Sequence, residues 1–218
     1  MPGADNTEEA RRREMVSTQI EARGIKNPRV LDAMRSVPRH LFVPANLRDE
    51  AHRDGPLPIG HEQTISQPYI VALMTELIRP EASTKVLEVG TGSGYQAAVL
   101  AECVDSVYTI EILPELGRQS AALLERLGYD NVHTRIGDGF DGWPEEAPFD
   151  AILVTAAPAE VPRPLKEQLA EGGRLVIPVG RGSQDLIVLT RTAKGFERSH
   201  VTGVRFVPMT GKAERRPE

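Results

Sequence analysis

The chain has 218 residues, of which 40% are hydrophobic and 26% are charged. A chain of this length can bury the core of one domain, and the composition is typical of globular proteins. Its 31 acidic and 26 basic residues give a net charge of −5, and no basic stripe with interleaved aromatic residues occurs. These features argue against nucleic acid as a partner.

Membrane, secretion and metal signals are absent from the sequence. No run of about eighteen apolar residues occurs that would span a bilayer, and the polar N-terminus lacks the apolar region of a secretory signal. The single cysteine, Cys103, excludes an intramolecular disulfide and fits a reducing compartment. The five histidines lack metal-binding spacings such as HxxxH. We therefore expect a cytoplasmic protein with no membrane partner and no metal site. A monomer is the working expectation, although the sequence does not reveal the oligomeric state.

The first 80 residues are predicted to contain three helices and one long loop. Apolar residues at helical intervals predict helices over 8–23 and 28–36. Residues 37–66 are rich in Pro, Gly, His and Asp, so we expect mostly ordered loop there. A third helix is expected over 67–79, where Pro68 is tolerated in the first turn because its missing N–H would have no partner.

After Pro80 the pattern changes to alternating strands and helices. Near-continuous apolar strands joined by helices predict a parallel sheet covered on both faces. Residues 184–209 carry two more strands separated by a Lys-Gly turn, which predicts an antiparallel hairpin. The expected strands are 85–90, 106–111, 131–138, 149–156 and 173–180, and the expected helices are 94–104, 114–127 and 159–170. The predicted fold class is α/β, a doubly wound, mostly parallel, Rossmann-like sheet with a C-terminal antiparallel hairpin and an N-terminal helical and loop extension.

A glycine-rich turn, LEVGTGSGYQ, follows the first of these strands and opens a helix. Gly90, Gly92 and Gly94 allow a tight turn and a close approach of the backbone to a ligand. The spacing is G-x-G-x-G, and Tyr95 stands where a dinucleotide fingerprint has its third glycine. Glu88 precedes the turn, and a carboxylate there would repel a pyrophosphate but suits a cationic ammonium and sulfonium. The turn therefore favours S-adenosylmethionine over NAD.

Two further acids follow the next two strands. Glu111 lies 21 residues after Gly90, where a carboxylate can accept both hydroxyls of a ribose, in NAD and S-adenosylmethionine alike. Asp138, between two glycines, is expected to accept from an adenine amino group. The competing interpretation is that both acids only mark solvated strand ends. Trp143 either covers the site or shields its edge, and Tyr95 and Cys103 are expected to pack in the core.

Several motifs together resemble the protein-L-isoaspartate O-methyltransferase family. They are VPRHLFVP (37–44), PLPIGHEQTISQPYIVALMTELI (56–78), VLEVGTGSGYQAAVLAE (86–102), VYTIE (107–111), GDG (137–139), DAILVTAAP (150–158) and VRFVPMTG (204–211). The QTISQP segment separates this family from other methyltransferases. The resemblance implies a class I methyltransferase domain over residues 14–211, in which 14–80 form the helical and substrate-loop extension and 81–211 the cofactor-binding core. Residues 1–13 are expected to be flexible, and the tail 212–218 departs from the animal members.

The same resemblance implies the reaction and its residues. The methyl group of S-adenosylmethionine goes to the free α-carboxylate of L-isoaspartyl residues in damaged proteins and peptides, leaving S-adenosylhomocysteine, and the ester collapses to a succinimide. Ser66 is implied to be catalytic. The implied cofactor contacts are Thr64, Ile65, Ser66, Glu88, Gly90, Thr91, Gly92, Ser93, Gly94, Glu111, Ile112, Gly137, Asp138, Gly139 and Thr210, and the substrate contacts are Ile59, Gly60, His61 and Val207.

Several alternatives stay open at this stage. Ser66 is expected to orient the substrate carboxylate, but it also stands where a serine would cap the helix that begins near Gln67. His61 contacts substrate or only braces its loop, and we favour bracing. A small-molecule carboxyl methyltransferase is the nearest competing function. An NAD-dependent oxidoreductase is disfavoured because the third glycine and a catalytic His or Tyr-Lys pair are missing, and a catalytically inactive adenosine-binding module is disfavoured by the intact acids.

Overall fold

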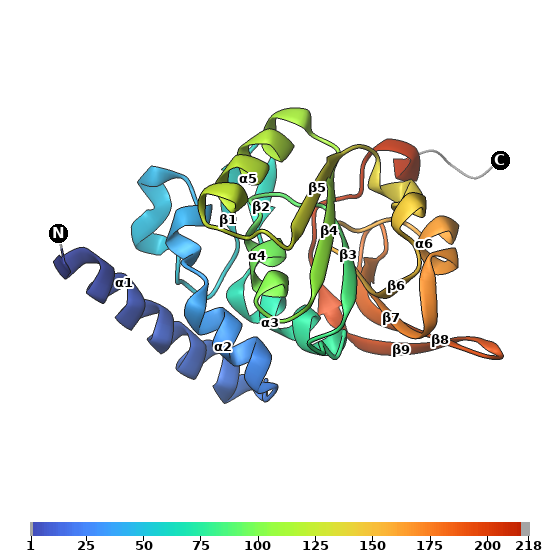
Figure 1. Cartoon of the computed structure of the whole chain (residues 1–218), viewed down its shortest axis with the longest axis horizontal. Helices are drawn as coiled ribbons and strands as arrows, with labels where there is room; N and C mark the ends of the chain where they lie inside the picture. The colour runs from blue at the N-terminus through green and yellow to red at the C-terminus, as the bar shows by residue number, and fades with distance from the viewer. Residues whose placement is uncertain (1, 215–218) are drawn as a thin grey trace.

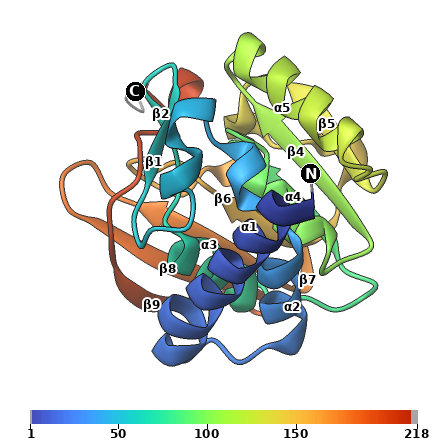
Figure 2. The same cartoon turned by 90° about the vertical axis from the view of Figure 1, so that its left-hand side faces the viewer.

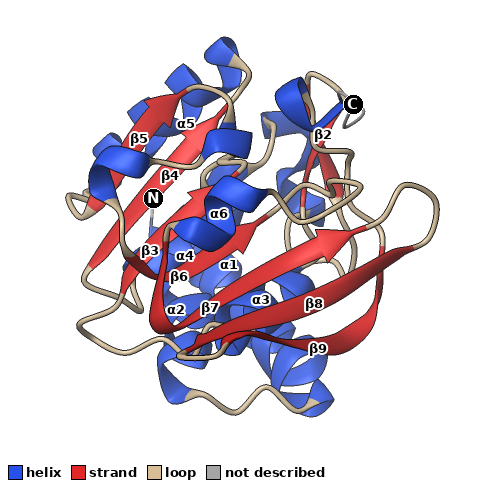
Figure 3. Cartoon of the chain, turned by 90° about the vertical axis from the view of Figure 1, so that its right-hand side faces the viewer, coloured by secondary structure: helices blue, strands red, loops and turns tan. Residues whose placement is uncertain are grey.

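A seven-stranded sheet forms the centre of the computed structural model, which describes residues 2–214 (Figure 3). The strand order is β5-β4-β3-β6-β7-β8-β9. Strands β3 to β7 pair in parallel, β8 pairs antiparallel with β7, and β9 pairs antiparallel with β8. The predicted doubly wound sheet with an antiparallel hairpin at its end is therefore confirmed. The strands are β3 (Lys85–Val89), β4 (Ser106–Glu111), β5 (Val132–Ile136), β6 (Phe149–Val154), β7 (Leu169–Val179), β8 (Gln184–Thr192) and β9 (Gly195–Val204).

Helices cover both faces of this sheet (Figure 1). Because alternate residues of a strand point to opposite faces, Val86 and Leu87 of β3 belong to two different hydrophobic clusters. The cluster around Val86 includes side chains of α3 (Pro68–Leu77) and α4 (Tyr95–Ala101), and α5 (Pro114–Arg126) contributes Leu124 to it. The other cluster includes Leu165 of the short helix α6 (Arg163–Glu167).

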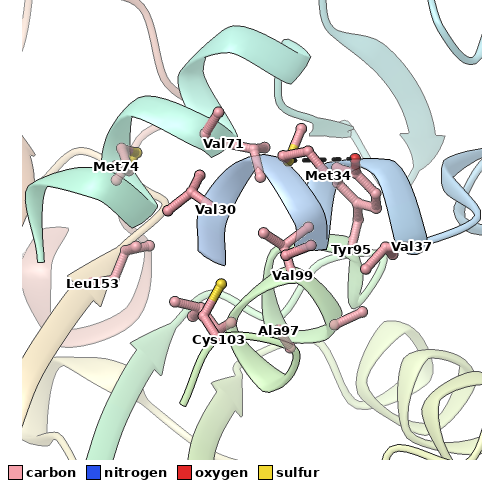
Figure 4. Close-up of a cluster of buried hydrophobic side chains, with 14 of the residues drawn as sticks. Val30, Met34, Val37, Val71, Met74, Tyr95, Ala97, Val99, Cys103 and Leu153 are labelled. Carbon is pink, nitrogen blue, oxygen red and sulfur yellow. Dashed lines mark hydrogen bonds between the residues drawn. The ribbon is translucent and has the colours of Figure 1, made fainter. Parts of the chain in front are cut away.

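The N-terminal extension packs on the face that carries α3 and α4. Helix α1 (Pro2–Met15) continues as a π-helical turn and a 3₁₀ turn that end at Gly24, and α2 (Pro28–Ser36) follows, capped by the Asn27 side chain (Figure 2). Figure 4 shows Val30 and Met34 of α2 packed between α3 and α4. Residues 2–13, which we expected to be flexible, are helical. Ion pairs one turn apart, such as that between Glu9 and Arg13, support this helix.

The segment predicted as loop over 37–66 contains more regular structure than expected. Two 3₁₀ helices, η3 (Arg39–Phe42) and η4 (Ala45–Glu50), precede a hairpin of β1 (Leu57–Gly60) and β2 (Gln63–Ile65). The hairpin turn places His61 and Glu62 at φ +51° and +59°. Prolines and short strands hide the two-residue alternation in the sequence, and non-glycine residues in the turn removed the usual hairpin signal.

Helix α6 is the clearest difference in extent, since we expected a helix over 159–170. Its N-cap is Pro162, and it ends at Glu167 because Leu169 already pairs with Phe149 as the first residue of β7. Proline fixes the backbone before the helix and restricts the residue that precedes it. Among residues 2–214, no helix is long and apolar enough to cross a membrane.

Candidate active site

A cavity of about 280 Å³ opens at the carboxyl ends of β3, β4 and β6. The chain leaves β3 toward α4 on one face and leaves β6 toward α6 on the other, and ligands of doubly wound sheets bind where the connections diverge in this way. The predicted residues that line the cavity are His61, Thr64, Ile65, Ser66, Gly90, Thr91, Gly92, Ser93, Glu111, Ile112, Asp138, Gly139, Val207 and Thr210. The predicted residues Ile59, Gly60, Glu88, Gly94 and Gly137 are not among the lining residues.

The glycine turn presents its main chain to the cavity. Gly90 has φ +98°, and a Cβ added there would lie 2.3 Å from Thr155 Oγ1, so the position needs glycine for both conformation and space. The Thr155 hydroxyl donates to the Gly90 carbonyl at 2.6 Å and fixes the turn against β6. Gly94 has φ +87° and packs against Leu124 and Ser120 of α5 instead of facing the cavity. Contacts within the protein therefore hold the turn in this conformation.

Glu111 is buried at the cavity wall, and the main chain fixes its carboxylate. One oxygen accepts from the Gly92 N–H at 2.8 Å and the other from the Leu113 N–H at 3.0 Å. A carboxylate oxygen can accept more than one hydrogen bond. Glu111 can therefore hold the turn and still accept two hydroxyls of a ribose, as the sequence predicted.

The burial of Glu88 shows that our charge argument against a pyrophosphate was wrong. Its side chain is fully buried beneath the turn, where Oε2 accepts from the Thr109 hydroxyl, and Thr109 in turn shares a hydrogen bond with Thr91. Burial raises the pKa of the Glu88 carboxyl to about 8, so that the carboxyl carries its proton at neutral pH. A neutral acid does not repel a pyrophosphate. The case against NAD therefore rests on the glycine spacing and not on this charge.

The third strand and the C-terminal segment close the opposite side of the cavity. Asp138 accepts from the Phe140 N–H at 3.0 Å and from the Lys212 N–H at 2.8 Å, so its carboxylate holds the chain that follows Thr210. Ala157 exchanges main-chain hydrogen bonds with Val207 and Met209, at 2.8 and 2.9 Å, which keeps that segment beside the end of β6. Thr210 consequently lines the cavity, although it is far from the glycine turn in sequence.

The QTISQP segment lies between two cavities. A second cavity of about 670 Å³ shares Thr64, Ser66, Thr155 and Val207 with the first. The N-cap of α3 is Gln67, and no side chain makes a capping hydrogen bond there. The alternative in which Ser66 serves as the helix cap is therefore wrong. Ser66 lines both cavities, at the place where they meet.

The β1–β2 hairpin covers the glycine turn. The Ile59 Cδ1 atom lies 3.6 Å from where a Cβ of Gly92 would be, so Ile59 packs against the turn from outside the cavity. At the hairpin tip, His61 Nε2 lies 3.7 Å from a carboxylate oxygen of Glu115 at the start of α5. This contact fits the bracing role that we favoured for His61, although its side chain also borders the cavity.

Some lining residues were missed, and others that we singled out lie elsewhere. Thr155, Ala156, Gln96 and Met209 line the cavity without having been predicted. Thr155 and Ala156 directly follow β6, so the rule that ligands bind at strand ends beside the switch in connections would have found them. Trp143 does not line the cavity. Its ring packs edge-on against Tyr108, with the ring centroids 5.4 Å apart, so of our two interpretations the one in which Trp143 shields the edge of the site remains. Cys103 is buried in the core, as expected.

Fold and site together define a class of protein. A seven-stranded sheet with this order, a glycine turn after its first parallel strand and an acid at the end of the next are the features of a class I methyltransferase. The model of the family "Protein-L-isoaspartate(D-aspartate) O-methyltransferase (PCMT)" matches residues 10–214. The chain belongs to this family.

Curated relatives and solved structures agree with this assignment. A protein-L-isoaspartate O-methyltransferase from Synechococcus sp. (strain JA-2-3B'a(2-13)) is 56% identical over 216 residues, covering 95% of this chain and 88% of the relative. One from Syntrophobacter fumaroxidans is 55% identical over 208 residues, covering 95% and 97%. A solved protein-L-isoaspartate O-methyltransferase superposes with a TM-score of 0.84 at 28% identity, covering 92% of this chain and 67% of that chain.

A second solved structure has a ligand. It is a candidate enzyme of the same name from Plasmodium falciparum in complex with S-adenosyl-L-homocysteine. Its TM-score is 0.79 at 27% identity, and the match covers 91% of this chain and 98% of that chain.

Proposed function

We propose that the protein transfers the methyl group of S-adenosylmethionine to the free α-carboxylate of L-isoaspartyl residues in proteins and peptides, and that Ser66 orients this carboxylate. The family assignment carries the reaction, with its cofactor S-adenosylmethionine and its product S-adenosylhomocysteine. The observation that supports the role of Ser66 is its position, because it lines both cavities where they meet.

The first cavity fits S-adenosylmethionine by the chemistry of its walls. The glycine turn leaves its main chain uncovered at Gly90, where a side chain would collide with Thr155. Glu111, held by two N–H groups, offers acceptors for the ribose. Asp138 offers the remaining acceptor capacity of its carboxylate toward an adenine amino group. When bound, the cofactor supplies an electrophilic methyl group on a sulfonium.

The protein's part in the reaction is placement and not proton transfer. The substrate α-carboxyl has an unperturbed pKa of about 3.5, so it is ionised at neutral pH and needs no general base. It must be aligned with the methyl group and lose part of its water. The Ser66 hydroxyl and the nearby main-chain N–H groups can donate to the carboxylate without adding a competing buried charge. The proline on each side of this segment limits its motion.

The preference for isoaspartate follows from distance. An isoaspartyl residue carries the chain through its side-chain carboxyl, which leaves the α-carboxylate free and one methylene nearer the backbone than a normal aspartate carboxylate. If the peptide backbone is held in one cavity and the cofactor in the other, that difference changes the distance between the carboxylate and the methyl group. A misplacement of about 1 Å can reduce a rate by roughly 100-fold. We assign the second cavity to the peptide, because it shares Ser66 with the cofactor cavity and is the larger of the two.

The variant Ser66→Ala tests this assignment. Loss of a hydrogen bond to a charged group removes about 1.5–3 kcal/mol, so kcat should fall by about 10- to 150-fold. The affinity for S-adenosylhomocysteine, measured by calorimetry, should stay nearly unchanged because the main chain remains. Ser199→Ala, an exposed serine on β9 that lines neither cavity, is the control. Wild-type kcat in a folded Ser66→Ala protein would remove the hydroxyl from the reaction.

We also propose that the protein acts as a cytoplasmic monomer without nucleic-acid or membrane partners. The single buried cysteine supports the cytoplasm, and the net charge of −5 and the absence of a basic stripe in the sequence argue against nucleic acid. Light scattering at micromolar concentration tests the monomer, and a mass of twice 23.9 kDa would contradict it.

A further inference from the structure

Arg39 is a fully buried arginine directly behind the QTISQP segment. It lies in the 3₁₀ helix η3, and its guanidinium donates from Nε to the Ala51 carbonyl at 2.7 Å. From Nη2 it donates to the Ser66 carbonyl at 2.8 Å. The group also stacks on Tyr95, with the guanidinium carbon 4.7 Å from the ring centroid. One side chain thus joins the end of η4, the substrate segment and the first residue of α4.

This arrangement is unusual for a buried charge. Within residues 2–214, Arg39 takes part in none of the ion pairs, so its charge is met by carbonyl dipoles and an aromatic face. Burying a cation without a carboxylate is unfavourable unless hydrogen bonds compensate. Burial accordingly lowers the pKa of the guanidinium below its ordinary value. Because replacing buried charges by apolar residues of similar volume is often neutral or stabilising, a contribution to folding stability does not by itself explain this arginine.

The Ser66 carbonyl is the point at which these donors act on the active site. It belongs to the peptide unit that joins Ser66 to Gln67, the N-cap of α3. The hydrogen bonds of the helix begin at the next carbonyl, that of Gln67, which accepts from the Val71 N–H. The hydrogen bond from Arg39 therefore fixes a peptide plane that the helix leaves free. The same guanidinium touches Tyr95, which lines the cofactor cavity beside the glycine turn. Substrate segment and cofactor wall are fixed to one rigid, planar group.

We infer that Arg39 is a positioning residue for methyl transfer: by binding the Ser66 carbonyl while stacked on Tyr95, it holds the Ser66 segment at a fixed distance from the cofactor cavity. The inference rests on the proposed role of the Ser66 segment in placing the substrate carboxylate. Arg39 itself lines neither cavity. Its effect reaches the substrate through the main chain of Ser66.

The conservative variant Arg39→Lys separates positioning from charge. Lysine keeps the positive charge, but one ammonium cannot reproduce the planar fork that reaches two carbonyls and an aromatic face. Because displacement by about 1 Å can reduce a rate by roughly 100-fold, kcat of Arg39→Lys for an L-isoaspartyl peptide should fall by about 10- to 100-fold. The Kd for S-adenosylhomocysteine should rise by less than kcat falls, because the glycine turn and Glu111 are held by other contacts, although Ser66 and Tyr95 also line that cavity.

The chain offers a matched control at the other end of the same helix. Arg174 Nε donates to the Leu77 carbonyl at 2.6 Å, at the last residue of α3. Neither Arg174 nor Leu77 lines either cavity. Arg174→Met removes a guanidinium–carbonyl bond to α3, so it should lower the melting temperature and leave kcat unchanged. Hydrogen exchange of the peptide that spans 63–70 supplies a readout without turnover. That exchange should accelerate in Arg39→Lys and not in Arg174→Met.

The double variant Ser66→Ala/Arg39→Lys tests whether Arg39 affects catalysis through Ser66. If Arg39 acts through Ser66, the two losses in kcat should be smaller together than the product of the single losses, because residues that act as one unit are not additive. Wild-type kcat in Arg39→Lys, or an equal loss of kcat in Arg174→Met at equal stability, would overturn the inference. Failure of Ser66→Ala alone to lower kcat would instead reject the hydroxyl's role and leave the exchange result to decide on Arg39.

Discussion

Gly90→Ala tests the rigid glycine turn most sharply, because the structure fixes what the added methyl group meets. Gly90 has φ +98°, a conformation that costs an L-residue about 1–2 kcal/mol. The new Cβ would also lie 2.3 Å from Thr155 Oγ1, so the hydroxyl must leave the Gly90 and Val89 carbonyls. The hydroxyl has one proton, which the two carbonyls share, so losing it removes about 1 kcal/mol. We expect a total loss in unfolding free energy of about 2–3 kcal/mol.

Gly90→Ala should weaken ligand binding as well. The displaced turn carries the Gly92 N–H that fixes Glu111, so the affinity for S-adenosylhomocysteine should fall by at least about 10-fold, or 1.4 kcal/mol. Gly128→Ala is the matched control, because Gly128 has φ +80° but nothing within 4 Å of the added Cβ. Gly128→Ala should lose only the free energy of placing an L-residue at positive φ, and it should bind S-adenosylhomocysteine with wild-type affinity.

A compensating variant makes the reasoning refutable. With Thr155→Ala the nearest contact at 2.3 Å disappears, so the double variant Gly90→Ala/Thr155→Ala should bind S-adenosylhomocysteine better than Gly90→Ala alone. The assays are urea unfolding and isothermal calorimetry. Equal stability losses for Gly90→Ala and Gly128→Ala, with normal binding in both, would refute the steric account of the turn.

Two further predictions concern the buried acids. Glu111→Ala removes charge-assisted hydrogen bonds worth about 1.5–3 kcal/mol. The affinity for S-adenosylhomocysteine, measured by calorimetry, should therefore fall by about one to two orders of magnitude in a folded protein. Unchanged affinity would mean that Glu111 does not bind the ribose. The pKa of Glu88 is raised to about 8 in the folded state, above its ordinary 4.5. The unfolded state therefore loses the proton first, and Glu88 lowers stability by about 1.4 kcal/mol per pH unit as the pH rises between these values. Denaturant titrations at pH 5.5 and 7.5 should show Glu88→Gln gaining stability relative to wild type, and parallel curves would contradict the raised pKa.

The fold was predictable because its signals are local. Apolar runs and helical spacing located all five strands of the parallel part and the hairpin after them. The β1–β2 hairpin was missed because its turn uses His61 and Glu62 at positive φ, where glycine or asparagine is the usual signal. Helix α6 was predicted too long because Leu169 pairs with Phe149, a contact between distant residues that overrides helical spacing.

The site shows the same division between local and tertiary information. Strand-end residues such as Glu111 and Asp138 were predicted because a parallel sheet brings the carboxyl ends of its strands to one edge. The charge state of Glu88 was not predictable, because it depends on burial beneath the turn. Arg39 was missed for a related reason. It reads as one basic residue in VPRHLFVP, and only the fold places it behind Ser66.

The central claim is that the junction of the two cavities selects an L-isoaspartyl carboxylate for methylation. The most direct measurement compares radiolabelled methyl transfer from S-adenosylmethionine to an L-isoaspartyl peptide and to its L-aspartyl twin under saturating cofactor. We predict rapid labelling of the first peptide and negligible labelling of the second. Equal labelling of the two peptides would contradict the account.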